Sequence, residues 1–118
     1  MSRQSLQCNI GFADGEIEGY TKEGAQLKVH VRAWNESSIE FVFGDVVRVL
    51  DDGAGEISDV CLEISQTEFM SAALAIEYEQ VPSDHPYKEY VFLDIDDVPS
   101  LRIVAATVEV ICEGAKDE

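Results

Sequence analysis

The sequence predicts a single α+β domain over residues 1–118, with a mostly antiparallel, meander-like β-sheet of six to seven strands and one main helix near residues 66–78. Short stretches of alternating apolar and polar residues, separated by turn residues, are typical of antiparallel strands with one solvated face. Only one stretch has helical spacing, and it precedes the last two strand patterns. We therefore expect a sheet that is curved or partly folded into a sandwich, with the helix covering one face.

The first strand patterns lie before residue 35. Residues 6–12 (LQCNIGF) alternate, and the following Asp14-Gly15 favours a turn, so we expect a hairpin with the next segment, EIEGY. Residues 26–34 (QLKVHVRAW) alternate as well, which predicts a strand with one apolar and one polar face. Trp34 stands opposite the apolar row of that strand. It either covers a second small core or is exposed for a partner.

Two further strand patterns follow. Residues 39–50 (IEFVFGDVVRVL) have strong β character, and Gly44-Asp45 within them indicates a bulge or bend that resets the faces of the residues after it. The segment DDGAG then predicts a loop. Residues 56–64 (EISDVCLEI) indicate another strand, with one break in its alternation.

The period of the pattern changes after this strand. In SQTEFMSAALAIEYEQVP the apolar positions follow helical spacing, Ser65-x-x-Glu68 fits a capping box, and Pro82 limits the far end. A helix is the favoured interpretation, although ALAIEY alone also suits a strand. Strands at 88–95 and 101–112 complete the pattern, and we expect them to pair through the turn DDVPS.

The chain is strongly acidic, with 24 Asp and Glu against 8 Lys and Arg and a net charge of −16. Between Asp51 and Asp97 there are thirteen acids and one base, Lys88, which gives −12. A surface of this charge repels phosphate backbones and anionic lipids, so we expect no direct binding to nucleic acid or membrane. It would attract a basic protein, although solubility alone also accounts for such a charge.

No motif in the sequence indicates catalysis. Cys8, Cys61 and Cys112 are odd in number, have no C-x-x-C spacing and lie in apolar patterns, so we expect buried, reduced thiols. His30 lies within a strand pattern and His85 in a loop, and no nucleophile motif accompanies either. Gly-rich phosphate loops are absent. We therefore predict that the protein is not an enzyme and carries no cofactor.

The segment EYVFLDIDDVPS, residues 89–100, sets several carboxylates among apolar residues. Asp94 and Asp96, two positions apart on a strand, would point to the same side, and Asp97 would add oxygen ligands for a divalent cation. The other positions of known calcium loops are missing, and aspartate is a common turn former. The sequence therefore favours a turn over a metal site.

A binding surface is the remaining interpretation, because acids alternate with aromatic residues from residue 77 to residue 97. Tyrosines are enriched at interface hot spots, and carboxylates around them pair with lysine or arginine of a partner. Tyr90 and Phe92, two apart on one strand, are assigned to the core instead. The candidate partner-binding residues are Glu77, Tyr78, Glu79, Asp84, Tyr87, Asp94, Asp96, Asp97 and Trp34.

The stretches DGEIEGYTKEGAQLKVHVRAW, IEFVFGDVVRVL and YKEYVFLDIDDVPSLRIVAATVEV together cover most of the chain. In strand spacing they resemble small acidic bacterial immunity proteins, which neutralise toxins made by competing cells, and related uncharacterised bacterial proteins. The resemblance implies a protein that occludes the active site of a toxin or blocks its basic substrate groove. Its acids would stand in for phosphates where the toxin is a nuclease.

The predicted function is a non-enzymatic protein-binding domain of the immunity-inhibitor type, which docks an acidic surface on a basic, toxin-like partner. Two alternatives stay open: a domain that binds a small ligand or a divalent metal, and a homo-oligomeric structural module such as a homodimer joined by apolar strands. The sequence has no apolar run of membrane-spanning length and no secretory-signal pattern, which predicts a cytoplasmic location.

Overall fold

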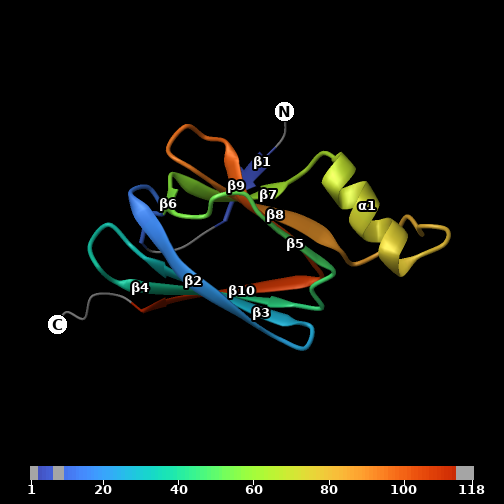
Figure 1. Cartoon of the computed structure of the whole chain (residues 1–118), viewed down its shortest axis with the longest axis horizontal. Coiled ribbons are helices and arrows are strands. Elements are labelled where there is room, and N and C mark those ends of the chain that lie inside the picture. Colours follow the sequence, from blue (N-terminus) through green and yellow to red (C-terminus); the bar gives the residue numbers. More distant parts are fainter. Residues whose placement is uncertain (1–2, 7–9, 114–118) are drawn as a thin grey trace.

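The protein folds into two antiparallel sheets of five strands each, with one helix on the outside of one sheet (Figure 1). The structure is a computed structural model that describes residues 3–6 and 10–113. Sheet A has the order β1 (Arg3–Ser5), β7 (Asp59–Glu63), β8 (Lys88–Leu93), β9 (Pro99–Ala105) and β5 (Arg48–Asp51). Sheet B has the order β10 (Thr107–Glu113), β4 (Ser38–Gly44), β3 (Gln26–Arg32), β2 (Gly15–Glu23) and β6 (Glu56–Ile57).

The predicted antiparallel, mostly β fold with one helix is confirmed, but the predicted strand number is too low. Seven segments of the described chain are extended, and three of them bend and pass from one sheet to the other, which gives ten strands. These three segments contain β4 with β5, β6 with β7, and β9 with β10. Of the two predicted forms, a curved sheet or a partial sandwich, the structure agrees with the second, as two sheets that share bent segments. The expected pairing of β8 with β9 is confirmed.

The bends occur where the alternation of the sequence is interrupted. At Gly44 the chain leaves sheet B, and an added Cβ there would lie 2.5 Å from Oγ1 of Thr107, so a side chain would displace the neighbouring strand. The oxygen of Gly44 accepts a hydrogen bond from Ala106 N (3.0 Å), at the point where β9 continues into β10. Ser58, between β6 and β7, donates its N–H to the oxygen of Leu93 (2.8 Å). These contacts fix the corners at which the two sheets meet.

The main core lies between the sheets and is built from the inward faces of the alternating strands. Phe41 is fully buried, and its ring centroid lies 5.5 Å from that of Phe12 and 5.0 Å from that of Phe92. Tyr90 is also buried there, so its assignment and that of Phe92 to the core are confirmed. Residues 7–9 of the first predicted hairpin lie outside the described residues, and its predicted second strand, β2, pairs with β3 and β6 instead. Phe12 belongs to the core without being part of a strand.

The helix α1 (Glu68–Glu77) covers part of the outer face of sheet A, in agreement with the predicted range. Its N-cap is Thr67, whose Oγ1 accepts a hydrogen bond from Met70 N (3.1 Å). The capping box predicted at Ser65 is therefore wrong by two residues. One face of α1 buries Met70, Ala73 and Leu74 against Val104 of β9. No helix among the described residues has the length and apolar character needed to cross a membrane.

The three cysteines differ from one another, although all were expected to be buried, reduced thiols. Cys61 is buried and free, and burial raises the pKa of its thiol to about 11. Cys112 is half-buried in β10 and is disulfide-bonded, so the expectation of a reduced thiol is wrong there. Cys8 lies outside the described residues. An odd number of cysteines therefore did not exclude a disulfide at Cys112.

A hydrogen bond joins the two sheets on the side where β2 approaches β5. The Tyr20 hydroxyl donates to Oδ2 of Asp51 (2.5 Å), whose other oxygen accepts the N–H groups of Gly53 and Ala54. The bond to Asp51 is the main cause that raises the pKa of Tyr20, and the same bond lowers the pKa of Asp51. The stabilisation from Asp51 is therefore present above its ordinary pKa and lost as the pH falls. The stabilisation from Tyr20 is present below about pH 10, its ordinary pKa, and is lost at higher pH.

We expect ultraviolet difference titration of the protein against Tyr20→Phe to give a pKa for Tyr20 above its ordinary value near 10. In the Asp51→Asn background this pKa should fall toward the ordinary value, because the carboxylate that holds the proton is gone. A Tyr20 that titrates at or below its ordinary value in the unmodified protein would show that the bond to Asp51 does not form in solution.

Candidate functional site

Two tyrosines that are separated in the sequence meet beyond the C-terminal end of α1. Tyr78 follows the helix directly, and the loop after it returns to place Tyr87 immediately before β8. Their ring centroids are 6.2 Å apart with an interplanar angle of 64°, and His85 stacks on Tyr87 at 6.3 Å. Both tyrosines are half-buried against Leu74 and its neighbours. The pair thus forms a platform that is fixed to the core of the protein.

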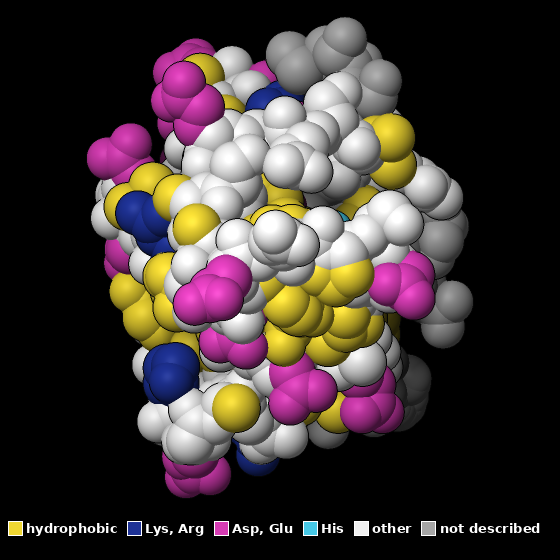
Figure 2. Space-filling model, turned by 90° about the vertical axis from the view of Figure 1, so that its right-hand side faces the viewer, with side chains coloured by type: hydrophobic (Ala, Val, Ile, Leu, Met, Phe, Trp, Pro, Cys, Tyr) yellow, Lys and Arg dark blue, Asp and Glu magenta, His cyan; other side chains and the backbone are white. Residues whose placement is uncertain are grey.

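Large apolar side chains are exposed beside this platform. Ile76 is 64% exposed on the outer face of α1, and Val81 is 46% exposed in the loop that follows. Figure 2, which looks at the helix side of the molecule, shows an apolar area in the middle of this face with acidic side chains around it. We call this region the tyrosine surface; it comprises Ile76, Glu77, Tyr78, Glu79, Val81, Asp84 and Tyr87.

The rim of the tyrosine surface is negative. Glu77, Glu79 and Asp84 are exposed, and no lysine or arginine occurs between residues 49 and 87. Burial raises the pKa of Tyr87, and Glu77 adds to this shift through its negative charge and a 3.5 Å hydrogen bond from the Tyr87 hydroxyl. The tyrosine therefore stays protonated and available as a hydrogen-bond donor at neutral pH.

A cleft of about 270 Å³ lies next to the tyrosine surface, where β7 and β8 part from one another. We call it the fork cleft. One wall is the segment from β7 to α1, the other is the segment that leads into β8, and Tyr87 belongs to both the cleft and the tyrosine surface. Its lining residues are Leu62, Glu63, Ile64, Ser65, Gln66, Met70, His85, Tyr87, Lys88 and Glu89.

Two buried carboxylates lie side by side at the base of the fork cleft, since Glu63 and Glu89 are direct partners across β7 and β8. Glu89 is 1% exposed and accepts hydrogen bonds from Thr67 Oγ1 (2.5 Å) and from Arg102 Nη1 (2.6 Å). Glu63 accepts one from Arg3 Nε at 2.6 Å. The bond from Thr67 ties the cap of α1 to the sheet, so Glu89 fixes the position of the helix.

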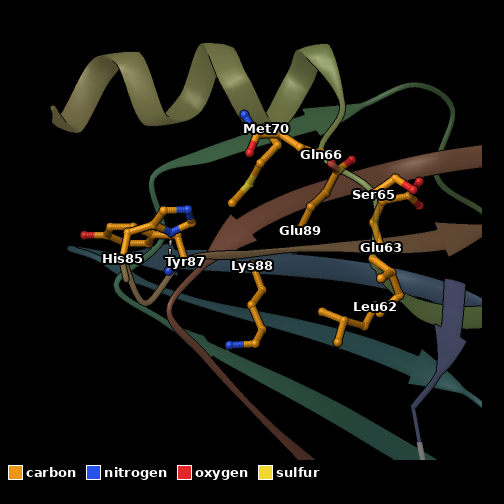
Figure 3. Close-up of a pocket in the computed structure, with 10 residues that line it drawn as sticks. Leu62, Glu63, Ser65, Gln66, Met70, His85, Tyr87, Lys88 and Glu89 are labelled. Carbon is orange, nitrogen blue, oxygen red and sulfur yellow. Dashed lines mark hydrogen bonds between the residues drawn. The ribbon is translucent and has the colours of Figure 1, made fainter. Parts of the chain in front are cut away.

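Figure 3 shows how the side chains around the fork cleft are oriented. Met70 points from α1 toward the cleft, and His85 and Tyr87 stack at one side of it. Lys88 extends from β8 away from the helix. His85 Nδ1 accepts the N–H of Tyr87 (3.2 Å), which fixes the imidazole ring beside the cleft.

Five of the nine predicted partner-binding residues come together, and four do not. Those in the tyrosine surface are Glu77, Tyr78, Glu79, Asp84 and Tyr87. Asp94, Asp96 and Asp97 lie in the turn after β8. Tyr87 lies at the other end of β8, and a strand of six residues is about 20 Å long. Trp34 is 61% exposed in the turn between β3 and β4, at the opposite end of the molecule from α1 (Figure 1).

The aspartates of the β8–β9 turn hold the turn together. Oδ1 of Asp94 accepts the N–H groups of Asp96 (2.8 Å) and Val98 (3.0 Å), and Oδ1 of Asp97 accepts the hydroxyl of Ser58 (2.8 Å). The predicted turn is confirmed by these bonds and by the pairing of β8 with β9. Within residues 3–6 and 10–113, no cluster of three histidine, cysteine or acidic side chains is arranged to hold a metal ion.

Sequence reasoning missed Ile76, Val81, Glu63 and Glu89. Ile76 is one of the apolar residues in the helical pattern, but the buried stripe is formed by Met70, Ala73 and Leu74. Glu89 alternates with Val91 and Leu93, so the pattern itself indicated a carboxylate on a buried face. That signal was present, but its partners come from other segments.

Comparison of the chain with protein-family models, with curated proteins and with solved structures finds no match.

Proposed function

We propose that the protein is a non-enzymatic binding domain of the immunity-inhibitor type, which docks its tyrosine surface on a basic, toxin-like protein. The observation that carries this proposal is an exposed apolar centre, with Ile76 and Val81 around two packed tyrosines, inside a rim of carboxylates. Protein interfaces have this arrangement, with aromatic anchors in the centre and polar groups at the rim.

The physical chemistry of the surface favours a protein partner. Apolar side chains such as Ile76 gain free energy when they leave water, and the packed Tyr78 and Tyr87 lose little conformational entropy on binding. The carboxylates at the rim stay partly solvated, so they contribute mainly to the rate of encounter and to the choice of a basic partner. The proposal thus assigns affinity to the centre and selectivity to the rim.

The proposal narrows the surface that the sequence indicated. Asp94 accepts hydrogen bonds within its own turn, and Asp97 accepts one from Ser58 between β6 and β7, so we leave both out of the docking surface. Trp34 is left out because of its distance from α1. The cytoplasmic location stays a prediction, and Cys112 does not support it, because disulfides persist mainly in oxidising compartments.

The test compares three forms of the protein as bait in a lysate of the source cells, with quantitative mass spectrometry. The first is unmodified, and the second carries Glu77→Gln, Glu79→Gln and Asp84→Asn. The third carries Glu23→Gln, Glu56→Gln and Glu109→Gln, which remove the same charge at exposed sites elsewhere. We expect one basic protein that the first and third forms retain, that the second loses, and that added salt releases.

The captured basic protein, once purified, should associate with the second form about tenfold more slowly than with the third at low salt, because the rim carboxylates steer the encounter. Equal retention of every captured protein by the two triple variants would show that the tyrosine surface is not the docking site. Ile76→Ser, which leaves the charge unchanged, should raise the dissociation rate instead.

A further inference from the structure

We propose that the fork cleft receives one arginine or lysine side chain of the partner that docks on the tyrosine surface. This inference rests on the proposed function and adds the anchor residue that the partner must supply. Tyr87 lines both regions, so a protein seated on the tyrosine surface lies directly over the mouth of the cleft.

The size of the fork cleft suits a side chain. Pockets for drug-sized ligands typically have volumes of about 300 to 1,000 Å³, and this cleft of about 270 Å³ lies below that range. Its walls include Leu62, Ile64, Met70 and Tyr87, which offer apolar surface along the depth of the cleft. The aliphatic stem of arginine or lysine packs on such surface while its charged end reaches polar groups.

Acceptors for a cation remain free in the cleft. The side chain of Glu63 is only 5% exposed, and Oε1 binds Arg3, whereas no hydrogen bond from the described residues reaches Oε2. Among the described residues, no donor bonds to the carbonyl oxygens of Ile64 and Ser65, so these oxygens are also available. A carboxylate oxygen without a donor at the wall of the cleft favours a ligand that brings N–H groups.

The charge of the surroundings decides between a cation and an anion. Arg3 and Arg102 balance the formal charges of Glu63 and Glu89. Lys88 lines the cleft but extends away from the helix (Figure 3). The electrostatic potential at the mouth of the cleft is therefore set mainly by the acidic rim and by the net charge of −16. The acidic rim and this net charge favour an incoming cation over a carboxylate or phosphate.

The test uses N-acetyl-arginine methylamide as the probe and follows the backbone amide signals of the ¹⁵N-labelled protein by NMR. We expect saturable shifts at residues 62–66 and 85–89. The matched citrulline derivative has nearly the same shape without the charge, and it should bind at least about tenfold more weakly because it lacks the charge-assisted bonds. The lysine derivative should bind at the same residues.

Ser65→Trp fills the fork cleft from an exposed position, and Ser83→Trp places the same side chain in the loop outside it. We expect Ser65→Trp to abolish the shifts and Ser83→Trp to preserve them, in proteins whose remaining spectra show the native fold. Equal binding of the arginine and citrulline derivatives, shifts at other residues, or no saturable shifts would each overturn the inference.

The two proposals fail in different ways. A partner that is lost from the rim variant but retained by Ser65→Trp would leave the docking surface intact and remove the arginine anchor. Arginine binding in the cleft without any rim-dependent partner would remove the docking function and leave a small cation site. Loss of the partner from both the rim variant and Ser65→Trp, with retention by Ser83→Trp, supports both proposals.

Discussion

Replacing Arg102 by methionine is expected to lower the free energy of unfolding by about 3 kcal/mol or more, because it leaves the carboxylate of Glu89 buried without its cation. Glu89 is 1% exposed, and after the substitution only the hydroxyl of Thr67 would still donate to it among the described residues. Urea denaturation followed by circular dichroism measures the change. The double variant Arg102→Met with Glu89→Leu should recover most of the loss, because the unpaired charge is gone.

Arg32→Met is the matched control for this experiment. Arg32 pairs with Glu16 (2.7 Å) and Glu18 (3.4 Å), but the side chains on both sides of these ion pairs are about half exposed. Exposed ion pairs contribute little to stability, so we expect a loss below about 1 kcal/mol. A cost for Arg102→Met as small as that for Arg32→Met would contradict a buried, structurally required pair at Glu89.

Phe41→Ala is expected to destabilise the protein by about 3 to 5 kcal/mol, the usual cost of removing a buried phenylalanine ring. Phe41 is fully buried, and its ring contacts those of Phe43 in sheet B and Phe92 in sheet A. It also contacts the ring of Phe12, which lies outside the strands. The cavity would therefore open at the junction of the sheets. Thermal unfolding measures the effect, and Phe41→Leu should lose clearly less because it keeps most of the volume.

Trp34→Ala is the matched control for the loss of an aromatic ring. Trp34 is 61% exposed in a turn, so its removal should change stability by no more than about 0.5 kcal/mol. A loss comparable to that of Phe41→Ala would show that Trp34 covers a second core, which was the other interpretation of its position in the sequence.

The strands were predictable because alternation reports which side of a strand is buried. Leu27, Val29 and Val31 are all buried, as their spacing predicted. A partial sandwich was among the expected forms, but the assignment of each strand to one sheet was not predictable, because alternation carries no information about the partner strand. The bend at Gly44 was visible as Gly-Asp, yet its outcome depends on Thr107 of a distant segment.

The candidate site was predictable only in part, for the same reason. Tyr78 and Tyr87 were chosen because they lie in or beside a loop, and the structure brings them into contact. The pairing of Glu89 with Arg102 and Thr67 joins three segments, so the sequence pattern around Glu89 does not contain it. The N-cap was misplaced because both Ser65 and Thr67 suit that role locally.

The sharing of bent segments between the sheets affects how the protein is made on the ribosome. The strands β2, β3 and β4 are consecutive and can pair early, but the outer edge of β4 pairs with β10, more than sixty residues later in the chain. Until β10 emerges, the nascent chain presents an open strand edge, which is a site of aggregation. The strongly acidic composition of the chain keeps neighbouring nascent chains apart during that interval, so the acidity also protects the protein during biosynthesis.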